Sequence, residues 1–414
     1  MYNNVGGYPS PQQMGYSSGG YGMPMNQGGM GYGTGVGGYP NAPTGQFMGY
    51  NSGQGMGYNA GPMGGYGGPM GGYGSPMGGP GMGYAGGPIG GAMGGPMGAP
   101  IGGTGTMSCN PEQEAQALRT AMKGFGTDEK GIMAVILRTN SYERAEIKRV
   151  YKSAFGRDLI DDLKKELSGN FEDVCVGMFM TPAEYDAYCL YKAMKGLGTN
   201  EGVLIEIIGS RNNIELTNIK TAFHAMYGKP LEKWIKDETS GNFRKLLISL
   251  LQCQRSINPT PDMNQCQMDA QRLYQAGEGK WGTDESIFNQ IFSSRSAAEI
   301  QCISQCYKNM RGKTLLKVID TEFSGDIKNL LNTVVFSLID LPGYYATRIR
   351  ESLKGTGTND SKLVRCIVSR AEIDMPAIKA AYLRLFNRDM LLDVRDDTSG
   401  DYKKILTHII ERAM

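Results

Sequence analysis

A fourfold repeat of one glycine-rich motif constrains this chain more than any other feature of its sequence. The motif reads MKGFGTDE at Met122–Glu129, MKGLGTNE at Met194–Glu201, GEGKWGTDE at Gly277–Glu285 and LKGTGTND at Leu353–Asp360. Its threonines, Thr127, Thr199, Thr283 and Thr358, are separated by 72, 84 and 75 residues. A second landmark, an arginine after an apolar run, recurs at nearly the same intervals, at Arg138, Arg211, Arg295 and Arg370. These intervals predict four repeats of about five short helices each, because two-helix repeats are shorter.

The composition divides the chain near residue 108. No charged residue or histidine precedes Glu112, and 40 of the 61 glycines lie in the first 105 residues. Such a segment cannot bury enough apolar surface to offset its chain entropy, so we expect a disordered, low-complexity Gly/Tyr/Met/Pro-rich tail. The expected domains are the tail at 1–108 and repeats at 109–180, 181–255, 260–339 and 340–414.

The charged part of the chain has the periodicity of helices almost throughout and little that indicates strands. Asn110 suits a helix N-cap, with Pro111 at the first helical position. Asn140 and Glu143 have the spacing of a capping box, and Gly156 follows the apolar stripe that they open. We therefore predict an all-α fold.

A carboxylate follows every loop threonine at one fixed distance. Thirty-nine residues beyond Thr127, Thr199, Thr283 and Thr358 stand Glu166, Glu238, Glu322 and Asp397. Glycine turns expose backbone carbonyls, since glycine adopts positive φ without a clash. Carbonyl oxygens with one carboxylate suit a hard cation, and Ca²⁺ tolerates irregularly placed oxygens better than Mg²⁺ does. The sequence thus predicts four Ca²⁺ sites, each closed by a distant acid.

One carboxylate neutralises only part of the charge of a divalent cation, and it leaves some coordination positions unfilled. We expect such a site to be weak alone and to tighten when a lipid phosphate enters. The residue before the last glycine of the loop is apolar in three loops, at Phe125, Leu197 and Trp281. Lys123, Lys195 and Lys354 are positioned to reach phosphates. For Trp281, contact with lipid and packing against protein are about equally expected.

Other functional classes are disfavoured. The 42 Lys and Arg nearly balance the 40 Asp and Glu, which argues against a nucleic-acid binder. The eight cysteines form no C-x-x-C pair and only His224 and His408 are present, so a zinc site or a histidine-based enzyme is not expected. Cys302 and Cys306 share a helix face, where buried thiols are favoured over a redox switch. No secretory signal or membrane-spanning run is evident.

The four motifs and their spacing closely resemble the four repeats of the annexin family, from about Glu112 to the C-terminus. The tail resembles those of synexin-type (seventh-class) annexins. The resemblance implies an all-α, slightly curved disc of four five-helix repeats, with calcium loops on its convex, membrane-facing side. The ligands it implies are the carbonyls of three loop residues in each repeat together with the distant acid. They are Met122, Gly124, Gly126 and Glu166; Met194, Gly196, Gly198 and Glu238; Gly277, Lys280, Gly282 and Glu322; and Leu353, Gly355, Gly357 and Asp397. The third set departs from the others, because Lys280 stands where they have their first glycine.

The expected function is calcium-dependent binding of acidic phospholipid membranes by a non-enzymatic protein of the cytoplasm that becomes peripheral on membranes when calcium rises. It would serve membrane organisation, aggregation or fusion, or vesicle trafficking. The alternative is a calcium-dependent, ion-permeable membrane assembly, lined by charged helices where the repeats meet. The family resemblance also implies a penta-EF-hand protein as a partner of the tail, and self-association on membranes is an open alternative.

Overall fold

The computed structural model describes residues 108–355 and 357–412, and within these ranges every regular element is a helix. The expected all-α fold is therefore confirmed. The disorder expected for the tail concerns residues that lie outside the described ones, apart from Ser108. In the part of the chain that is described, no helix is both long enough and apolar enough to cross a membrane.

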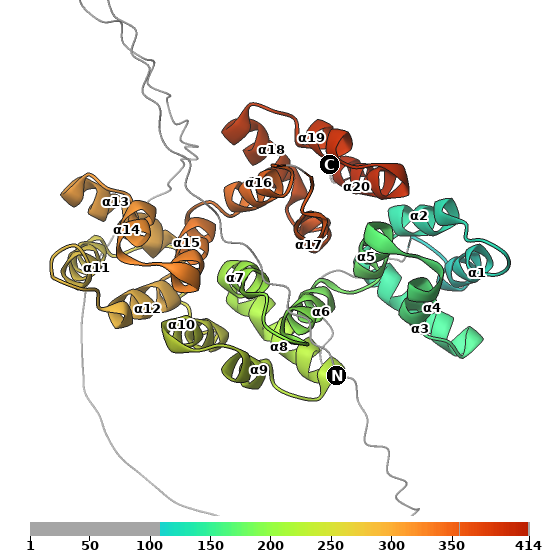
Figure 1. The fold of residues 1–414 in the computed structure, drawn as a ribbon, viewed down its shortest axis with the longest axis horizontal. Coiled ribbons are helices and arrows are strands. Elements are labelled where there is room, and N and C mark those ends of the chain that lie inside the picture. The colour runs from blue at the N-terminus through green and yellow to red at the C-terminus, as the bar shows by residue number, and fades with distance from the viewer. Residues whose placement is uncertain (1–107, 356, 413–414) are drawn as a thin grey trace, which may run out of the picture. The chain divides into compact units, whose positions relative to one another are not determined.

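The described residues form twenty helices, which follow one another in four runs of five (Figure 1). The first run is α1 Pro111–Ala121, α2 Glu129–Arg138, α3 Ser141–Phe155, α4 Leu159–Glu166 and α5 Gly169–Met178. The second is α6 Pro182–Met194, α7 Glu201–Ser210, α8 Asn213–Tyr227, α9 Leu231–Glu238 and α10 Gly241–Leu251. The third is α11 Met263–Ala276, α12 Glu285–Ser294, α13 Ala297–Arg311, α14 Leu315–Glu322 and α15 Gly325–Ile339. The fourth is α16 Leu341–Ser352, α17 Asp360–Arg370, α18 Met375–Phe386, α19 Met390–Asp397 and α20 Gly400–Arg412. We refer to the runs as repeats 1 to 4.

Local capping explains where these helices begin and end. Asn110 accepts hydrogen bonds from the backbone of α1, and Asn140 forms the predicted capping box with Glu143 at the start of α3. Equivalent capping boxes open α8 and α13. Gly156 ends α3 in the left-handed conformation, where a side chain would be strained. The third helix of repeats 1, 2 and 3 consequently has the same length and register.

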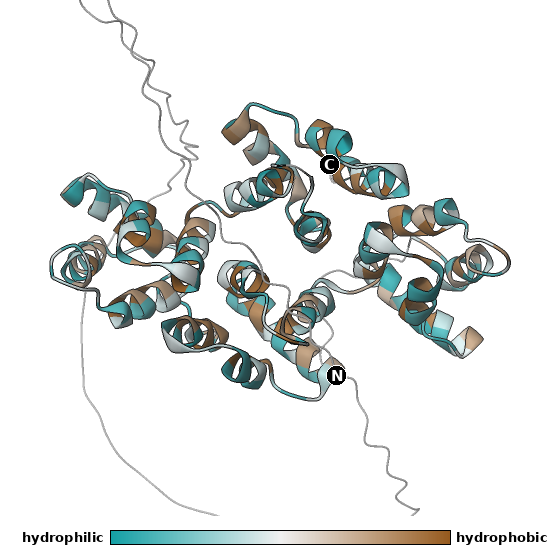
Figure 2. Ribbon diagram, viewed as in Figure 1, coloured by the Kyte–Doolittle hydropathy of each residue, from teal (hydrophilic) through white to brown (hydrophobic). Residues whose placement is uncertain are grey.

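The repeats pack in pairs that do not follow the order of the chain. Repeats 1 and 4 share one buried core, and repeats 2 and 3 share another. Helix α5 contacts α17 and α20 in the first pair, and α7 packs along α15 in the second (Figure 1). Single helices carry both apolar and polar residues (Figure 2), as expected of helices with one buried side. Each fully buried Leu or Ile in these cores contributes about 1.5–3 kcal/mol.

The landmark arginines form ion pairs with acids of the same chain. In repeats 1 to 3 the partner is an acid of the first helix, with N–O distances of 2.6 Å for Arg138–Glu114, 2.7 Å for Arg211–Asp186 and 2.7 Å for Arg295–Asp269. In repeat 4 the partners of Arg370 are Asp374, at 2.7 Å, and Glu215 of repeat 2, at 3.2 Å. The regular spacing of these arginines therefore reflects repeat cohesion.

Close packing between repeats 2 and 3 generates a stability prediction. A Cβ at Gly209 of α7 would stand 2.8 Å from the Thr333 Cγ2 of α15. We expect Gly209→Ala to lower the free energy of unfolding by about 1–3 kcal/mol, because the added methyl group overpacks this contact. Gly202→Ala, at an exposed position of the same helix, is the matched control. It should raise stability by up to about 1 kcal/mol, because alanine favours helices over glycine. Chemical denaturation measures both, and a gain in both variants would contradict the role of the contact.

Candidate metal loops

Each glycine-rich motif forms the turn between the first two helices of its repeat. The φ angles are +122° at Gly124 and +89° at Gly126 in the first loop, and the second loop repeats them with +131° and +86° at Gly196 and Gly198. A Cβ at any of these glycines would meet nothing within 4 Å. Glycine is therefore needed for the backbone angle, and crowding plays no part. Among the described residues, no backbone hydrogen bond ends on the carbonyls of these four glycines.

One backbone hydrogen bond closes every loop and reveals an insertion in the third. The N–H of the residue after the threonine donates to the carbonyl of a residue at the end of the preceding helix. The donor–acceptor pairs are Asp128–Ala121 (2.9 Å), Asn200–Ala193 (2.9 Å), Asp284–Ala276 (2.7 Å) and Asn359–Ser352 (2.8 Å). The sequence separation is seven residues in three loops and eight in the third. Counted from this bond, Gly277 takes the place of Met122, Met194 and Leu353, as the sequence assignment supposed.

The threonine of every loop donates a hydrogen bond to the acid 39 residues further on. The Oγ1–carboxylate distances are 3.3 Å for Thr127–Glu166, 3.0 Å for Thr199–Glu238 and 2.9 Å for Thr283–Glu322. Thr358 makes the same contact with Asp397. Each hydroxyl also lies 3.1–3.4 Å from the backbone carbonyl of that acid. The structure thus brings each predicted acid to its predicted loop.

Each of these acids is the last residue of its helix, at the ends of α4, α9, α14 and α19. The C-terminus of a helix carries partial negative charge, so a carboxylate there is disfavoured by about 0.3–1 kcal/mol. The same unfavourable placement occurs in all four repeats, each time beside a glycine loop.

The donor set fits a hard cation. Among the described residues, no group of three His, Cys, Asp or Glu side chains gathers for metal binding. In each loop one carboxylate lies on the loop threonine, so we expect the remaining ligands of an ion to be backbone carbonyls or water. Ca²⁺ accepts such a set of six to eight oxygens, whereas Zn²⁺ prefers nitrogen and sulfur ligands. The predicted ligands therefore suit calcium better than a transition metal.

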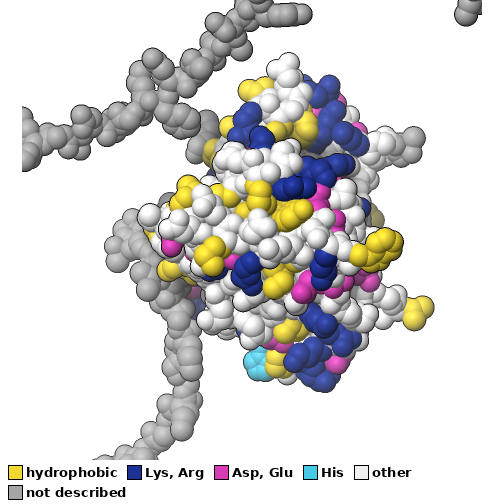
Figure 3. All heavy atoms as spheres, turned by 90° about the vertical axis from the view of Figure 1, so that its left-hand side faces the viewer, with side chains coloured by type: hydrophobic (Ala, Val, Ile, Leu, Met, Phe, Trp, Pro, Cys, Tyr) yellow, Lys and Arg dark blue, Asp and Glu magenta, His cyan; other side chains and the backbone are white. Residues whose placement is uncertain are grey.

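The apolar residues of three loops stand fully in solvent. Phe125, Leu197 and Trp281 have relative exposures of 112%, 108% and 103%. This excludes packing against protein as the explanation for Trp281. Hydrophobic side chains that project singly from the surface are visible in Figure 3. Lys123, Lys195 and Lys354 are also exposed, and Thr356 of the fourth loop lies outside the described residues.

Comparison with known proteins identifies the repeats. The sequence profile of the annexin family matches residues 113–178, 185–250, 268–334 and 344–409. The chain belongs to the annexin family. The resemblance seen in the motifs is thereby confirmed, and so is the four-repeat fold.

Both annexin sequences and solved annexin structures match this chain. Annexin A7 of Homo sapiens is 43% identical over 298 residues, which cover 72% of this chain and 61% of that protein. Annexin A13 of Mus musculus is 42% identical over 72% of this chain and 94% of its own length. Among solved structures, annexin III superposes with a TM-score of 0.71 at 37% identity, covering 73% of this chain and 94% of that one. Calcium-bound annexin (Sm)1 gives 0.63 at 34% identity, covering 73% and 90%. The match thus spans only about three fifths of the annexin A7 proteins.

The third loop of this annexin contains an acid to which the sequence analysis gave no role. Glu278 forms an ion pair with Lys313, and its carboxylate accepts a hydrogen bond of 2.7 Å from the Tyr307 hydroxyl. The Lys313 ammonium and the burial of the group, acting in opposite directions, leave the pKa of Glu278 lowered. The carbonyl of Gly277 accepts a hydrogen bond of 3.0 Å from the Lys280 N–H, unlike the glycine carbonyls of the first two loops. A carbonyl has a second lone pair, so this bond leaves Gly277 able to ligate. The only sequence signal for this arrangement was the extra residue of the loop.

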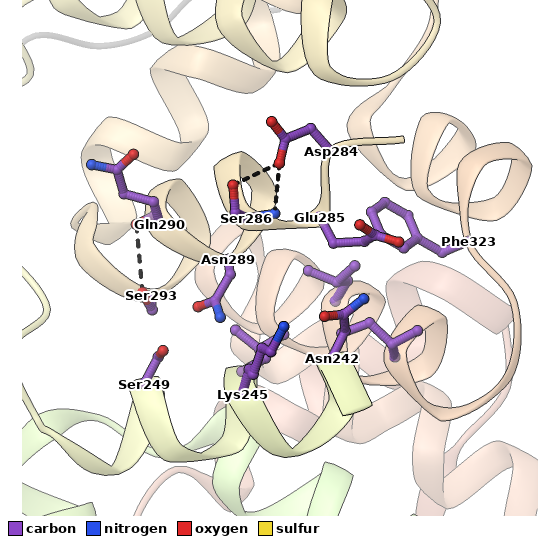
Figure 4. A pocket seen from close by; sticks show the side chains of 13 residues that line it. Asn242, Lys245, Ser249, Asp284, Glu285, Ser286, Asn289, Gln290, Ser293 and Phe323 are labelled. Atoms are coloured by element: carbon purple, nitrogen blue, oxygen red, sulfur yellow. Dashed lines mark hydrogen bonds between the residues drawn. The ribbon is translucent and has the colours of Figure 1, made fainter. Parts of the chain in front are cut away.

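A polar pocket lies beside the third loop, between α10 and α12 (Figure 4). Its volume is ≈ 340 Å³, and its lining includes Lys245 and Ser249 from α10 and Asn289 from α12. Asp284, the residue after the loop threonine, faces it and accepts hydrogen bonds from the backbone and the hydroxyl of Ser286, at 3.1 and 2.6 Å. The predicted metal ligands do not line this pocket. Among its lining residues, Asp284 caps the start of α12.

Buried carboxylates support two of the helices that end in a site acid. Asp162 of α4 accepts hydrogen bonds from Arg157, at 2.5 and 2.6 Å, and from the Tyr151 hydroxyl, at 3.0 Å. Asp393 of α19 has matching partners in Arg388 and the Tyr382 hydroxyl. The arginine hydrogen bonds hold the pKa of both carboxyls below its usual range, against the opposing effect of burial. Both acids lie one turn before a predicted ligand.

These lowered pKa values predict acid sensitivity with a definite sign. A depressed folded-state pKa contributes stability that is present above the unfolded value and is lost as the pH falls through the folded value. We expect the double variant Asp162→Asn, Asp393→Asn to be less stable than the native protein at pH 6. It should also lose less stability than the native protein between about pH 4 and pH 2. Asp396→Asn, an exposed acid of α19, is the control. Urea denaturation at a series of pH values makes the measurement, and parallel curves for native protein and double variant would refute the prediction.

Proposed function

We propose that this annexin binds acidic phospholipid membranes in a calcium-dependent manner through its four loops. The observation that carries the proposal is the fourfold hydrogen bond between a loop threonine and an acid placed at the unfavourable end of a helix. Calcium, when bound, would supply positive charge that is shared between these protein oxygens and the phosphate of a lipid.

The proposed ligands are three backbone carbonyls and one carboxylate in each repeat. They are Met122, Gly124, Gly126 and Glu166; Met194, Gly196, Gly198 and Glu238; Gly277, Lys280, Gly282 and Glu322; and Leu353, Gly355, Gly357 and Asp397. Carbonyls carry no net charge, so each set contributes a single negative charge toward a divalent ion. The imbalance of about one charge favours an anionic oxygen as a further ligand, and this makes binding depend on the lipid headgroup.

The exposed loop residues give the membrane a second kind of contact. Phe125, Leu197 and Trp281 are free to enter the boundary between headgroups and acyl chains, where aromatic and apolar side chains gain free energy. Lys123, Lys195 and Lys354 are positioned to meet lipid phosphates. The Lys195 Nζ lies 5.4 Å from the centre of the Tyr191 ring, which keeps this ammonium close to its own helix.

The wider role is proposed from similarity. Solved relatives include a calcium-bound annexin (Sm)1, and annexins A7 and A11 are among the proteins that this chain resembles. We propose a non-enzymatic protein of the cytoplasm that becomes peripheral on membranes as calcium rises and serves membrane organisation, fusion or vesicle trafficking. A penta-EF-hand partner for the tail and self-association on membranes belong to the same proposal and rest on the resemblance alone.

The alternative function, an ion-permeable assembly, has one observation in its favour. Glu206 of α7 is fully buried and contacts Arg365 at 2.7 and 2.8 Å, with Arg348 at 3.5 Å. Burial acts to raise the pKa of Glu206, but the two arginines more than offset it and the pKa is lowered. Every charge in this cluster has a partner, so the cluster is accounted for by cohesion between repeats 2 and 4. Membrane binding through the loops remains the proposed function.

Neighbouring acids provide a matched test of the calcium sites. Glu238 and Asp397 are proposed ligands, while Asp237 and Asp396 stand one residue earlier on the same helices and are exposed. We expect Glu166→Gln, Glu238→Gln, Glu322→Gln and Asp397→Asn together to abolish calcium-dependent sedimentation with phosphatidylserine vesicles. Each replacement removes the only charged ligand of its loop.

The pair Glu238→Gln, Asp397→Asn should raise the calcium concentration needed for half-maximal sedimentation by about tenfold or more, by analogy with other losses of metal-site partners. The pair Asp237→Asn, Asp396→Asn makes the same change in net charge, and it should leave this calcium concentration unchanged. Full sedimentation of the quadruple variant would disprove the proposed sites.

The two tryptophans give a direct probe of the third loop. Trp281 is fully exposed, whereas Trp234 packs against Tyr191 and Phe223. On addition of calcium and phosphatidylserine vesicles, we expect the emission of Trp281 to shift to shorter wavelength, because its indole leaves water. Trp234→Phe should retain the shift and Trp281→Phe should abolish it. No shift in Trp234→Phe, where Trp281 is the remaining tryptophan, would show that this loop does not enter the bilayer.

A further inference from the structure

Sulfur atoms gather on one face of repeat 3, away from the residues proposed for calcium. The thiols of Cys302 and Cys306, one turn apart on α13, both point at the thioether of Met263, the first residue of α11. The Sγ–Sδ distances are 3.9 Å from Cys302 and 3.8 Å from Cys306. Both cysteines are half-buried, and Met263 is 57% exposed. The sequence analysis favoured buried thiols here, but α13 places Cys302 and Cys306 at the surface.

The repeat fold does not require these sulfurs. The third helix has the same capping box and length in repeats 1, 2 and 3, so positions can be counted from its start. The positions of Cys302 and Cys306 are occupied by Glu146 and Val150 in repeat 1 and by Asn218 and Ala222 in repeat 2. The sulfur cluster is therefore a property of repeat 3 and needs its own explanation.

The surroundings of the cluster are uncharged. The three sulfurs line an open groove of ≈ 780 Å³ whose other lining residues include Gln301, Gln305 and Asn309, with no acidic, basic or histidine side chain. It lies on the side of the protein where α11 and α13 pack together, the side that Figure 3 faces. A hard cation would find no carboxylate there, while a soft cation would find thiols and a thioether within reach of solvent.

We propose that Cys302, Cys306 and Met263 form a binding site for a soft monovalent metal ion, Cu(I), held by two thiolates and one thioether. Metal–sulfur bonds of about 2.3 Å place the sulfurs of a tetrahedral or trigonal site about 3.8–4.0 Å apart. The separations of each thiol from the Met263 thioether, 3.9 and 3.8 Å, lie in this range.

The soft ligands favour Cu(I), and the binding step balances in protons and charge. Binding converts two thiols to thiolates and releases two protons to solvent, and the complex then carries one net negative charge. Neither the metal nor the sulfurs change oxidation state when the ion is supplied as Cu(I). Cys266, buried on α11 beside this cluster, is not a ligand. It is only 2% exposed and does not line the groove.

Competition with a chromophoric Cu(I) chelator under reducing, anaerobic and calcium-free conditions tests the site in the full-length protein. The native chain should bind one Cu(I) ion in competition with the chelator. Loss of a second-shell partner typically costs 10–100-fold in metal affinity, so loss of a thiolate in Cys302→Ser or Cys306→Ser should cost about 100-fold or more. Met263→Leu preserves size and removes only the thioether, and it should cost about tenfold.

Cys109→Ser is the matched control, because Cys109 is also half-buried but lies beside Glu143 and Glu114 of repeat 1. It should bind Cu(I) as the native protein does. X-ray absorption of the loaded protein should show three sulfur neighbours for copper, and circular dichroism verifies that each variant is folded. Undiminished binding by folded Cys302→Ser, Cys306→Ser protein, or nitrogen and oxygen neighbours around the copper, would overturn the proposal.

Discussion

The hydrogen bond from a loop threonine to an acid 39 residues away is the interaction on which the functional architecture depends. It joins the turn after the first helix of a repeat to the end of the fourth helix, so the carboxylate lies beside the glycine loop. The placement is locally unfavourable, since it adds a negative charge to the negative end of a helix. Recurrence of this placement in all four repeats is the observation that supports the proposed binding sites. Buried Asp162 and Asp393 also hold two of these helices in place, because each accepts hydrogen bonds from an arginine and a tyrosine.

Stability and binding are separated within each repeat. The apolar helix faces are buried in the two shared cores, while the loop residues Phe125, Leu197 and Trp281 remain outside them and fully exposed. Single apolar side chains are common on protein surfaces. Because these residues contribute nothing to the cores, their replacement should leave the fold intact.

Repeat 3 shows how a repeated scaffold accommodates differences. Its loop has one additional residue, yet the same closing hydrogen bond and the same threonine–acid contact are kept. The insertion is absorbed by Gly277, Glu278 and their contacts to Lys280 and Lys313. The third helix of the same repeat replaces polar and aliphatic residues of its equivalents with two cysteines, without any change in helix length. Both changes lie at surface positions, where side chains vary with little effect on the core.

The sequence by itself determined the helices, the four repeats and the pairing of each loop with its acid. These follow from periodicities and fixed spacings, as with the capping box at Asn140 and the interval from Thr199 to Glu238, because local geometry repeats whenever the sequence does. Only the tertiary structure decided that repeat 1 packs with repeat 4, that Trp281 projects into solvent, and that Met263 meets Cys302 and Cys306. Such contacts join residues without a common period or motif. They depend on which amphipathic helices from distant parts of the chain pack against each other. The spacing of residues along the sequence does not specify that packing.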